Sequence, residues 1–457
     1  MSTSTETEHG LESEFEHQAV PASHRKSLAS VAAVWFGFPM ILTCAVFGGI
    51  LAALLGFQRA LIAILIGNLI LFLYVGALSY VSGESGLNFA LVASRVFGRI
   101  GYIVASAFLA TVVVGWFAFQ TGLTGLTVNQ SFGWNQTLVT LIAGVSFIAI
   151  TYIGIRALSL LGMVAAPLFV VLALVSLWLI ASTPGGLGNV WGYQGVASGV
   201  GTMSVGAGIT LVVATFADSG TMTADFTRWA KNGKIAVLAA SSAFPIANVI
   251  AFLVGAVIVA SGAVKNPAAN GGNFLPFIAN GHGWLLSTLA LLFIFINLGS
   301  VCTHCLYNGA VGWSHILGSS MRRLTIVLGV LGTVAALAGV WSLFLDWLNI
   351  LGVFVPPIGA VVIMDQLLMR RTDDDGVQIK NVRWTSLLAW AVGAGAAGIV
   401  HFSAPQYVEV LAGIAAAAIV YAARPQQQRR RRPHQYRDSR EPQAVSVRSA
   451  ATRRSLF

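Results

Sequence analysis

The chain has 457 residues, of which 56% are hydrophobic and only 9% are charged, whereas an ordinary soluble domain carries about 25% charged residues. Apolar runs of about 20 residues recur along the chain, and runs of this length can cross the hydrocarbon core of a bilayer. This composition excludes a soluble globular protein and predicts an all-α polytopic membrane protein. The net charge of +10 comes largely from the ends of apolar runs and a C-terminal tail, so it does not indicate nucleic-acid binding.

The apolar runs are separated by glycine, proline and scattered charges, and they predict twelve transmembrane helices. Each is long enough to span a bilayer, in some cases only with tilt. In chain order the predicted helices cover residues 28–55, 60–82, 100–128, 137–155, 158–182, 202–229, 235–260, 285–313, 324–342, 347–369, 384–402 and 407–423.

Polar, charge-rich ends flank this apolar region, and their composition is typical of disordered tails. Basic residues also orient the bundle, because the predicted outer loops hold only Arg59 and Lys265. This asymmetry predicts that both termini are cytoplasmic, in a multi-pass protein of the cell membrane. The predicted segments are a disordered tail (1–26), a ten-helix core (27–371), two further transmembrane helices (372–423) and a basic disordered tail (424–457).

Two predicted transmembrane helices are interrupted inside the part that would cross the bilayer. The first carries WFGFP at residues 35–39, and the sixth carries FADSG at residues 216–220. Irregular backbone survives at this depth only where protein or a water-filled cavity satisfies it. Two broken helices five helices apart are typical of an inverted-repeat transporter that holds its substrate at the breaks. The alternative is a single packing kink in each helix.

The sixth helix also carries carboxylates in an otherwise apolar chain. Asp218 lies near its middle, where an ionisable group is costly, so its side chain should face the bundle interior or a cavity. Asp225 lies near the predicted cytoplasmic end with Arg228 one turn on, which indicates a structural ion pair or a cap. His304, in the eighth helix, is either a neutral histidine satisfied by a neighbouring helix or a ligand or proton-handling group.

Intramembrane carboxylates raise the possibility of an aspartyl protease, in which two aspartates share a proton. Asp218 and Asp365 are the candidates, but the chain lacks a GxGD motif, and the helix count does not fit. A channel or a receptor is a further alternative. Three cysteines, Cys44, Cys302 and Cys305, all fall in apolar segments and are interpreted as small apolar residues. No metal site, cofactor or catalytic residue is predicted.

Four stretches resemble the signature sequences of a known family. They are VGWFAFQTG (114–122), SGTMTADFTRW (219–229), CLYNGAVG (305–312) and VPPIGAVVIMDQLLMRR (355–371). They are similar to the nucleobase:cation symporters, the purine-cytosine permease family, and within it to the bacterial cytosine permeases. The resemblance covers residues 25–423.

This resemblance implies a core of two inverted five-helix repeats, about 27–182 and 200–371, followed by two additional helices. It implies import of cytosine or a related heterocycle with sodium or protons, and no enzymatic activity. The same architecture also carries purines, allantoin, hydantoin or other small heterocyclic amides. An oligomeric state does not follow from it.

The resemblance also implies site residues. A base would be held between Trp116 and Phe216, with Gln120, one helical turn from Trp116, hydrogen-bonded to its edge, and flat heteroaromatic rings do stack on aromatic faces. Backbone groups at the first break would contribute to the substrate and to a cation. The expected substrate site comprises Trp116, Gln120, Phe216, Thr215, Asp218, Gly37, Phe38, Ile41 and His304, and the expected coupling-ion site comprises Asp218, Gly37, Phe38, Ile41, Cys302 and Thr303.

The chain departs from the family pattern in two places. Cytosine permeases carry an Asn-Asp-Asn run where this chain has Cys302, Thr303 and His304, and a serine where it has Asp218. The substrate and the coupling ion therefore both remain open. The altered eighth helix favours proton coupling through Asp218 over sodium coupling.

Overall fold

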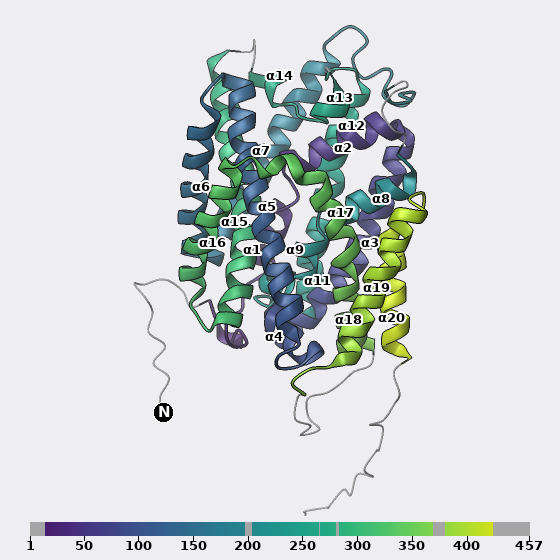
Figure 1. The fold of residues 1–457 in the computed structure, drawn as a ribbon. Helices are drawn as coiled ribbons and strands as arrows, with labels where there is room; N and C mark the ends of the chain where they lie inside the picture. The colour runs from purple at the N-terminus through teal and green to yellow at the C-terminus, as the bar shows by residue number, and fades with distance from the viewer. Residues whose placement is uncertain (1–13, 197–202, 265, 280–282, 369–379, 424–457) are drawn as a thin grey trace, which may run out of the picture. The chain divides into compact units, whose positions relative to one another are not determined.

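The computed structural model describes residues 14–196, 203–264, 266–279, 283–368 and 380–423 (Figure 1). The predictions for residues 1–13, for the C-terminal tail at 424–457 and for the start of the sixth helix at 202 lie outside the described residues. Helices make up the regular secondary structure of the described ranges.

In the first part of the chain, a short 3₁₀ turn (Ala22–His24) precedes seven helices, and the first predicted helix is divided in two. These helices are α1 (Leu28–Gly37), α2 (Leu42–Leu55), α3 (Phe57–Ser85), α4 (Phe89–Phe97), α5 (Tyr102–Phe132), α6 (Gln136–Ile153) and α7 (Ile155–Ala181).

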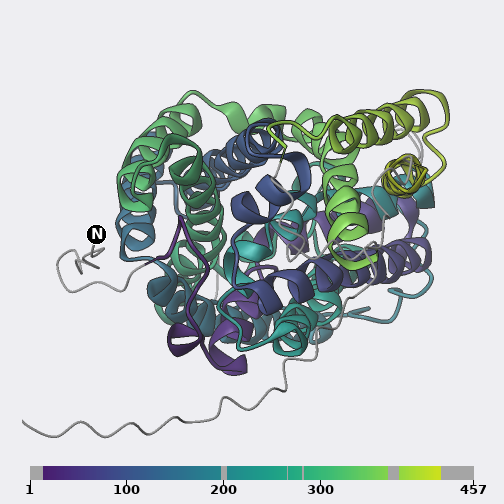
Figure 2. The same ribbon diagram turned by 90° about the horizontal axis from the view of Figure 1, so that it is seen from below.

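The second part begins with the broken sixth segment and ends with two helices, α19 and α20, that lie side by side at one edge of the bundle (Figures 1 and 2). Its helices are α8 (Val205–Ala214), α9 (Ala217–Thr221), α10 (Ala224–Thr227), α11 (Gly233–Ser241), a π turn (Ser242–Ala247), α12 (Asn248–Ala260), α13 (Pro267–Asn270), α14 (Leu275–Ala279), α15 (Trp284–Leu317), α16 (Met321–Leu337), a 3₁₀ turn (Val340–Leu343), α17 (Phe344–Phe354), α18 (Pro356–Ile363), a second π turn (Met364–Leu368), α19 (Trp384–Ser403) and α20 (Glu409–Ala422).

Among the described residues, eight helical spans are long and apolar enough to cross a membrane, or nine if α1 and α2 form one bent span. Two shorter apolar helices, α8 and α20, fall below that length. The predicted helices agree with these elements to within a few residues at most boundaries. The total of twelve spans remains a prediction, because the sixth segment consists of short pieces.

The first break lies slightly later than the sequence predicted. Helix α1 continues through Gly37, and the chain bends by 50° before α2 begins at Leu42. The proline ring at position 39 is incompatible with a continuous helix, since it removes a donor and crowds the preceding turn. Asn297 of α15 satisfies the freed backbone groups: its Oδ1 accepts from Leu42 N at 2.8 Å, and its Nδ2 donates to Met40 O at 2.6 Å.

The threonine-rich sixth segment is held against α3 by a row of hydroxyl pairs. Tyr74, Ser79 and Ser82 of α3 pair with Thr221, Thr223 and Thr227 at 2.5, 2.8 and 2.6 Å, respectively. Since α9 and α10 are only one turn each, they offer few backbone hydrogen bonds of their own. Paired hydroxyls satisfy polar groups in an apolar interior. This explains why the segment is rich in threonine.

Helices α2 and α12 pack with their backbones close together. A Cβ atom at Gly48 would overlap the Phe252 carbonyl, and one at Gly255 would overlap the Ala45 carbonyl. Small residues at such positions allow close helix approach within a membrane. This packing places α2, the second half of the first broken helix, directly against α12.

Asp365, near the end of the tenth predicted helix, joins the last two helices to the rest of the bundle. Its position close to Arg370 and Arg371 predicts a structural or gate contact with them, and both arginines lie outside the described residues. In the described part of the chain, the Asp365 carboxylate instead pairs with Arg383 at 2.6 Å and accepts from the Tyr421 hydroxyl. These contacts connect Asp365 to the start of α19 and to α20.

The N-terminal tail is the clearest difference from the sequence prediction. Residues 14–26, which were expected to belong to a disordered tail, run across the helix ends at one end of the bundle (Figure 2). Phe15 and Val20 are buried there, and the backbone of Lys26 donates to Trp229 O at 2.6 Å. A polar composition concealed these two apolar anchors and a set of specific hydrogen bonds.

Candidate substrate site

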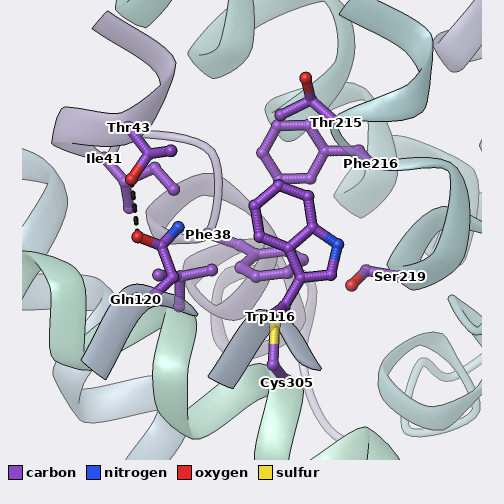
Figure 3. Close-up of a pocket in the computed structure, with 10 residues that line it drawn as sticks. Phe38, Ile41, Thr43, Trp116, Gln120, Thr215, Phe216, Ser219 and Cys305 are labelled. Atoms are coloured by element: carbon purple, nitrogen blue, oxygen red, sulfur yellow. Dashed lines mark hydrogen bonds between the residues drawn. The ribbon is translucent and has the colours of Figure 1, made fainter. Parts of the chain in front are cut away.

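A small cavity lies where the two broken segments meet α5 and α15 (Figure 3). Each of the four elements contributes side chains to the cavity. Several of the lining residues lie in the non-helical backbone between α1 and α2 or between α8 and α9. The lining residues are Phe38, Ile41 and Thr43 from the first break and α2, Trp116 and Gln120 from α5, Thr215, Phe216 and Ser219 from the sixth segment, and Val301 and Cys305 from α15.

Gln120 is held in one orientation by Thr43. The Thr43 hydroxyl donates to Gln120 Oε1 at 2.7 Å (Figure 3). Both side chains are buried, and Gln120 Nε2 has no hydrogen-bond partner among the described residues. An amide whose oxygen is already engaged presents its N–H groups as donors. Gln120 therefore offers a donor to a group in the cavity.

Aromatic faces form much of the cavity wall. Trp116 is 4% exposed, and Phe216 and Phe38 are 2% and 1% exposed. The rings of Phe38 and Phe216 meet edge to face, with centroids 5.4 Å apart. Every lining residue is formally uncharged. Such a wall suits a flat, neutral heterocycle better than a zwitterion or an ion.

Asp218 is adjacent in the chain to Ser219, which lines the cavity. It is fully buried, and its Oδ1 accepts a hydrogen bond from Ser219 N at 2.7 Å. The Trp116 side chain also interacts with its carboxyl group. No ion pair to Asp218 forms within the described residues. Asp218 itself does not line the cavity, although its neighbour Ser219 does.

Two other expected site residues lie outside the cavity lining. Gly37 packs against α7, where a Cβ atom would crowd Gly162 Cα at 2.5 Å. His304 is stacked on the far side of Phe38, with ring centroids 4.9 Å apart. Its Nδ1 faces the carbonyl of Ser300, one turn earlier in α15. His304 is thus one ring removed from the cavity.

The residues expected to bind a coupling ion are divided between different surroundings. Phe38 and Ile41 lie at the first break and line the cavity. Cys302 instead faces α5, with its sulfur 3.7 Å from the Thr121 hydroxyl. Thr303 donates to the carbonyl of Ser300 in its own helix at 2.9 Å. Neither side chain forms a hydrogen bond to the first break in the described structure.

Sequence reasoning missed several lining residues. Thr43, Ser219, Val301 and Cys305 were not proposed for the substrate site, and neither was Asn297, which holds the first break. A polar residue just after a helix break is a usable signal for Thr43 and Ser219, because the break predicts a cavity there. No sequence signal identifies Val301 or Cys305, whose positions depend on how α15 is rotated.

Comparison with known proteins supplies the family. The family model described as permease for cytosine/purines, uracil, thiamine, allantoin matches residues 19–421. The chain is 31% identical to the cytosine permease of Escherichia coli strain K12 over 384 residues, covering 84% of this chain and 88% of that protein. It is similar to the same extent to the cytosine permease of Escherichia coli O157:H7.

Solved structures share the fold. The nucleobase-cation-symport-1 family transporter Mhp1, in a closed conformation with bromovinylhydantoin bound, aligns with a TM-score of 0.73 at 20% identity, over 89% of this chain and 93% of that chain. A Na+-coupled sialic acid symporter aligns with a TM-score of 0.68 at 12% identity, over 90% and 91% of the two chains. The chain therefore belongs to the family of permeases for cytosine, purines, uracil, thiamine and allantoin, and it is a multi-pass membrane transporter rather than an enzyme.

Proposed function

We propose that the chain is a secondary active transporter that imports cytosine or a related small heterocycle by symport with a monovalent cation. One observation carries this proposal: an uncharged, aromatic-walled cavity between two broken helices contains a glutamine whose amide is fixed by Thr43. The cytosine permease of Escherichia coli, 31% identical over most of both chains, supports the substrate class.

The substrate ring lies between Trp116 and Phe216 in this proposal. Gln120 Nε2 donates to a ring carbonyl, while Ser219, together with the adjacent Asp218, interacts with N–H groups on another edge. A pyrimidinone or a cyclic ureide carries both kinds of group. Thr215 and the backbone near Phe38 and Ile41 complete the enclosure. His304 and Gly37 support this shell from outside, as their placements suggest.

The transport cycle requires the cavity to open alternately to the two sides of the cell membrane. We assign twelve spans, a five-plus-five inverted repeat with breaks in helices 1 and 6, and cytoplasmic termini. The charge asymmetry of the loops supports this orientation. A reporter fused after Ala423 tests it, since an external signal would reverse the direction of transport proposed here.

Of the two possible coupling ions, we favour a proton carried by Asp218 over sodium. A buried ionised carboxylate without a cationic partner is unfavourable, so the group takes up a proton or pairs with a substrate N–H. The alternative is sodium bound at the first break by carbonyls of Gly37, Phe38 and Ile41. The contacts of Cys302 and Thr303 with α5 and with their own helix give that alternative less support.

A second substrate class is a purine, allantoin, hydantoin or another small heterocyclic amide. The spacing of Trp116 and Gln120 along α5 favours it, because an aromatic face followed one turn later by an amide suits any planar cyclic amide. The fold neighbour Mhp1 was solved with bromovinylhydantoin bound, and the family description includes purines and allantoin.

Uptake into cells expressing the chain tests the proposal. Radiolabelled cytosine, uracil, hypoxanthine, allantoin and hydantoin are compared with sodium present or replaced, and with an imposed proton gradient. Concentrative cytosine uptake driven by protons supports the preferred form. Uptake driven by sodium alone supports the alternative, in which the coupling ion is sodium bound at the first break. Absence of gradient-driven uptake for every heterocycle rejects the proposed function.

A further inference from the structure

The N-terminal segment ends at a buried carboxylate, Glu14, which is only 3% exposed. Its Oε2 accepts from the Tyr307 hydroxyl at 2.8 Å, and its Oε1 accepts from Ile155 N at 3.1 Å. Ile155 is the first residue of α7, and Gly154 before it offers no capping side chain. Glu14 therefore caps α7 while it also binds α15. A carboxylate is favourable at a helix N-terminus.

Arg228 fixes the backbone of the same segment. Its guanidinium donates to Glu14 O at 2.8 Å and to Phe15 O at 2.9 Å, and it approaches the Tyr307 hydroxyl at 3.3 Å. Arg228 is completely buried, at the end of the broken sixth segment. The sequence predicted an ion pair between Arg228 and Asp225, or a cap formed by Asp225. In the structure its Nε donates to Asp225 O, and the Asp225 carboxylate accepts from Phe89 N at 2.8 Å.

Two further contacts extend the attachment. Glu16 Oε1 accepts from Met321 N, the first residue of α16, at 3.1 Å. Asn88 is the residue before α4, and its Nδ2 donates to Glu16 O at 2.7 Å. Residues 14–16 thus join α4, the end of the sixth segment, α7, α15 and α16. These elements belong to both of the proposed repeats.

The protein leaves room for Glu14. Gly154 has a φ of +96°, which favours glycine. A Cβ atom at this position would overlap Glu14 Oε1. The loop between α6 and α7 therefore accommodates the carboxylate through the absence of a side chain. This fit indicates a built receptor for Glu14 and not an incidental contact of a polar tail.

A continuous series of buried side chains connects Glu14 with the cavity. Phe38, which lines the cavity, stacks on His304, and His304 lies 5.4 Å from the ring of Phe226. Phe226 stacks on Tyr307 with centroids 5.9 Å apart. Tyr307 then donates to Glu14. These side chains are in contact from the cavity to the end of the bundle where residues 14–16 lie, and Glu14 is the last of them.

We propose that residues 14–16 form a latch that closes the substrate path on the cytoplasmic side, with Glu14 as its gate residue, and that this latch must leave its receptor before substrate is released. The inference rests on the proposed function for the direction of transport. Hydrogen bonds hold the latch at most of its contacts, and such contacts exchange with water at small net cost. They suit a closure that opens in every cycle.

The test measures access to Cys305, which lines the cavity and is 1% exposed. Sealed vesicles with the N-terminus facing the medium are treated with a membrane-impermeant maleimide, and mass spectrometry reports the labelling of each cysteine. Cys44 and Cys302, both buried away from the cavity lining, are internal references. Glu14→Ala removes both carboxylate contacts, and Tyr307→Phe removes one while keeping the ring.

We expect both variants to raise the labelling rate of Cys305 by about tenfold or more, since each removes a buried hydrogen bond and leaves a buried polar partner unsatisfied. Glu84→Ala is the matched control, because Glu84 accepts from Gly233 N at 2.8 Å at another helix start. It should label like the parent. Tyr307→Phe keeps the test valid if Glu14→Ala does not fold.

Equal labelling of Cys305 in parent, Glu14→Ala and Tyr307→Phe would overturn the latch, and so would an equal rise in Glu84→Ala. The measurement requires no substrate. A chain that shows the expected labelling but transports no heterocycle would retain the latch and lose the proposed function. If the chain transports cytosine but the variants label like the parent, the proposed function is retained and the latch is rejected.

Discussion

The hydroxyl of Thr43 donates a 2.7 Å hydrogen bond to Oε1 of Gln120 and connects α2 to α5 across the cavity. Thr43 lies immediately after the first break, so the position of the bent helix sets the orientation of the amide. A change in the bend during transport would release Gln120 from this orientation. The substrate contact and the conformational change are thereby linked through one hydrogen bond.

Thr43→Val should therefore alter selectivity more than protein stability. Without the hydroxyl, the Gln120 amide can present either its oxygen or its nitrogen to the cavity. We expect the preference for cytosine over competing heterocycles to fall, in a competition assay with labelled cytosine. Thr43→Ser, which keeps the hydroxyl, is the matched control.

Gln120→Leu should have a larger effect of the same kind. It removes the donor and leaves a substrate carbonyl without a partner, at a cost of about 1 to 3 kcal/mol for a buried polar group. Analogues that lack the carbonyl should lose little affinity. Parallel losses for analogues with and without the carbonyl would remove Gln120 from the substrate edge.

The proposed aromatic pair makes a different prediction. Trp116→Ala and Phe216→Ala should each weaken substrate binding by ~1 to 3 kcal/mol, the range for stacking of a base on an aromatic ring. Binding of labelled substrate to purified protein measures this effect. Trp178→Ala is the control, since Trp178 of α7 is 67% exposed. Wild-type affinity in both cavity variants would exclude the sandwich.

The sequence predicted the architecture of the site better than its individual contacts. Length and hydropathy locate most spans, and Pro39 predicts a break near the correct position because a proline ring cannot continue a helix. Trp116, Gln120 and Phe216 were named from sequence, and the structure brings all three to one cavity. Asn297 was not named, because its role depends on a distant backbone segment, residues 40–42.

Two further features show why such contacts escape sequence reasoning. The hydroxyl pairs between α3 and the sixth segment require knowledge of which helices are neighbours. Residues 14–16 have the composition of a tail, yet each forms a specific contact with a helix end or a buried side chain. Polar composition predicts disorder only when no receptor exists, and the residues that bind this segment lie from 72 to more than 100 positions away in the sequence.

Asn297→Leu should destabilise the first break. Met40 O and Leu42 N would lose their partner in a buried position, at about 1 to 3 kcal/mol for each group. We expect a lower midpoint of thermal unfolding in detergent and reduced transport. Asn129→Leu is the comparison, because Asn129 forms one hydrogen bond at a helix end, to Trp134 O at 2.7 Å. A similar midpoint for the two variants would contradict the role given to Asn297.

The latch should depend on pH through Glu14. Burial raises the pKa of Glu14 above its ordinary value of 4.5, against the lowering effects of the Tyr307 hydrogen bond and the charges of Arg228 and Arg322. A carboxyl group with a raised pKa binds its proton more tightly in the latched state than in the released state. Protonation therefore favours the latch, and its stability falls as pH rises through the raised pKa.

We accordingly expect the labelling rate of Cys305 in vesicles to increase with the pH of the medium on the N-terminal side. Maleimide addition itself speeds up with pH because the thiolate is the reacting form. Glu14→Gln cannot titrate at position 14 and should show only this intrinsic dependence, so the parent should rise more steeply with pH than the variant. Tyr307, Arg228 and Arg322 are the ionisable groups that act on Glu14, and all are retained in this variant. An identical pH dependence in parent and Glu14→Gln would assign the effect to another group.

Asp218→Asn separates the two roles proposed for Asp218. If Asp218 carries the coupled proton, the variant should lose concentrative uptake and its dependence on the proton gradient, yet keep substrate binding and exchange, because an amide has nearly the shape of a protonated acid. If Asp218 only contacts substrate N–H groups, binding should weaken while the ratio of protons to substrate stays the same. Its hydrogen bond from Ser219 N can persist in either case, since an amide oxygen also accepts. Counterflow and gradient-driven uptake in proteoliposomes, measured on the same preparation, distinguish these results. Uptake equal to that of the parent, with unchanged ion dependence, would make Asp218 structural and return sodium at the first break to the leading position.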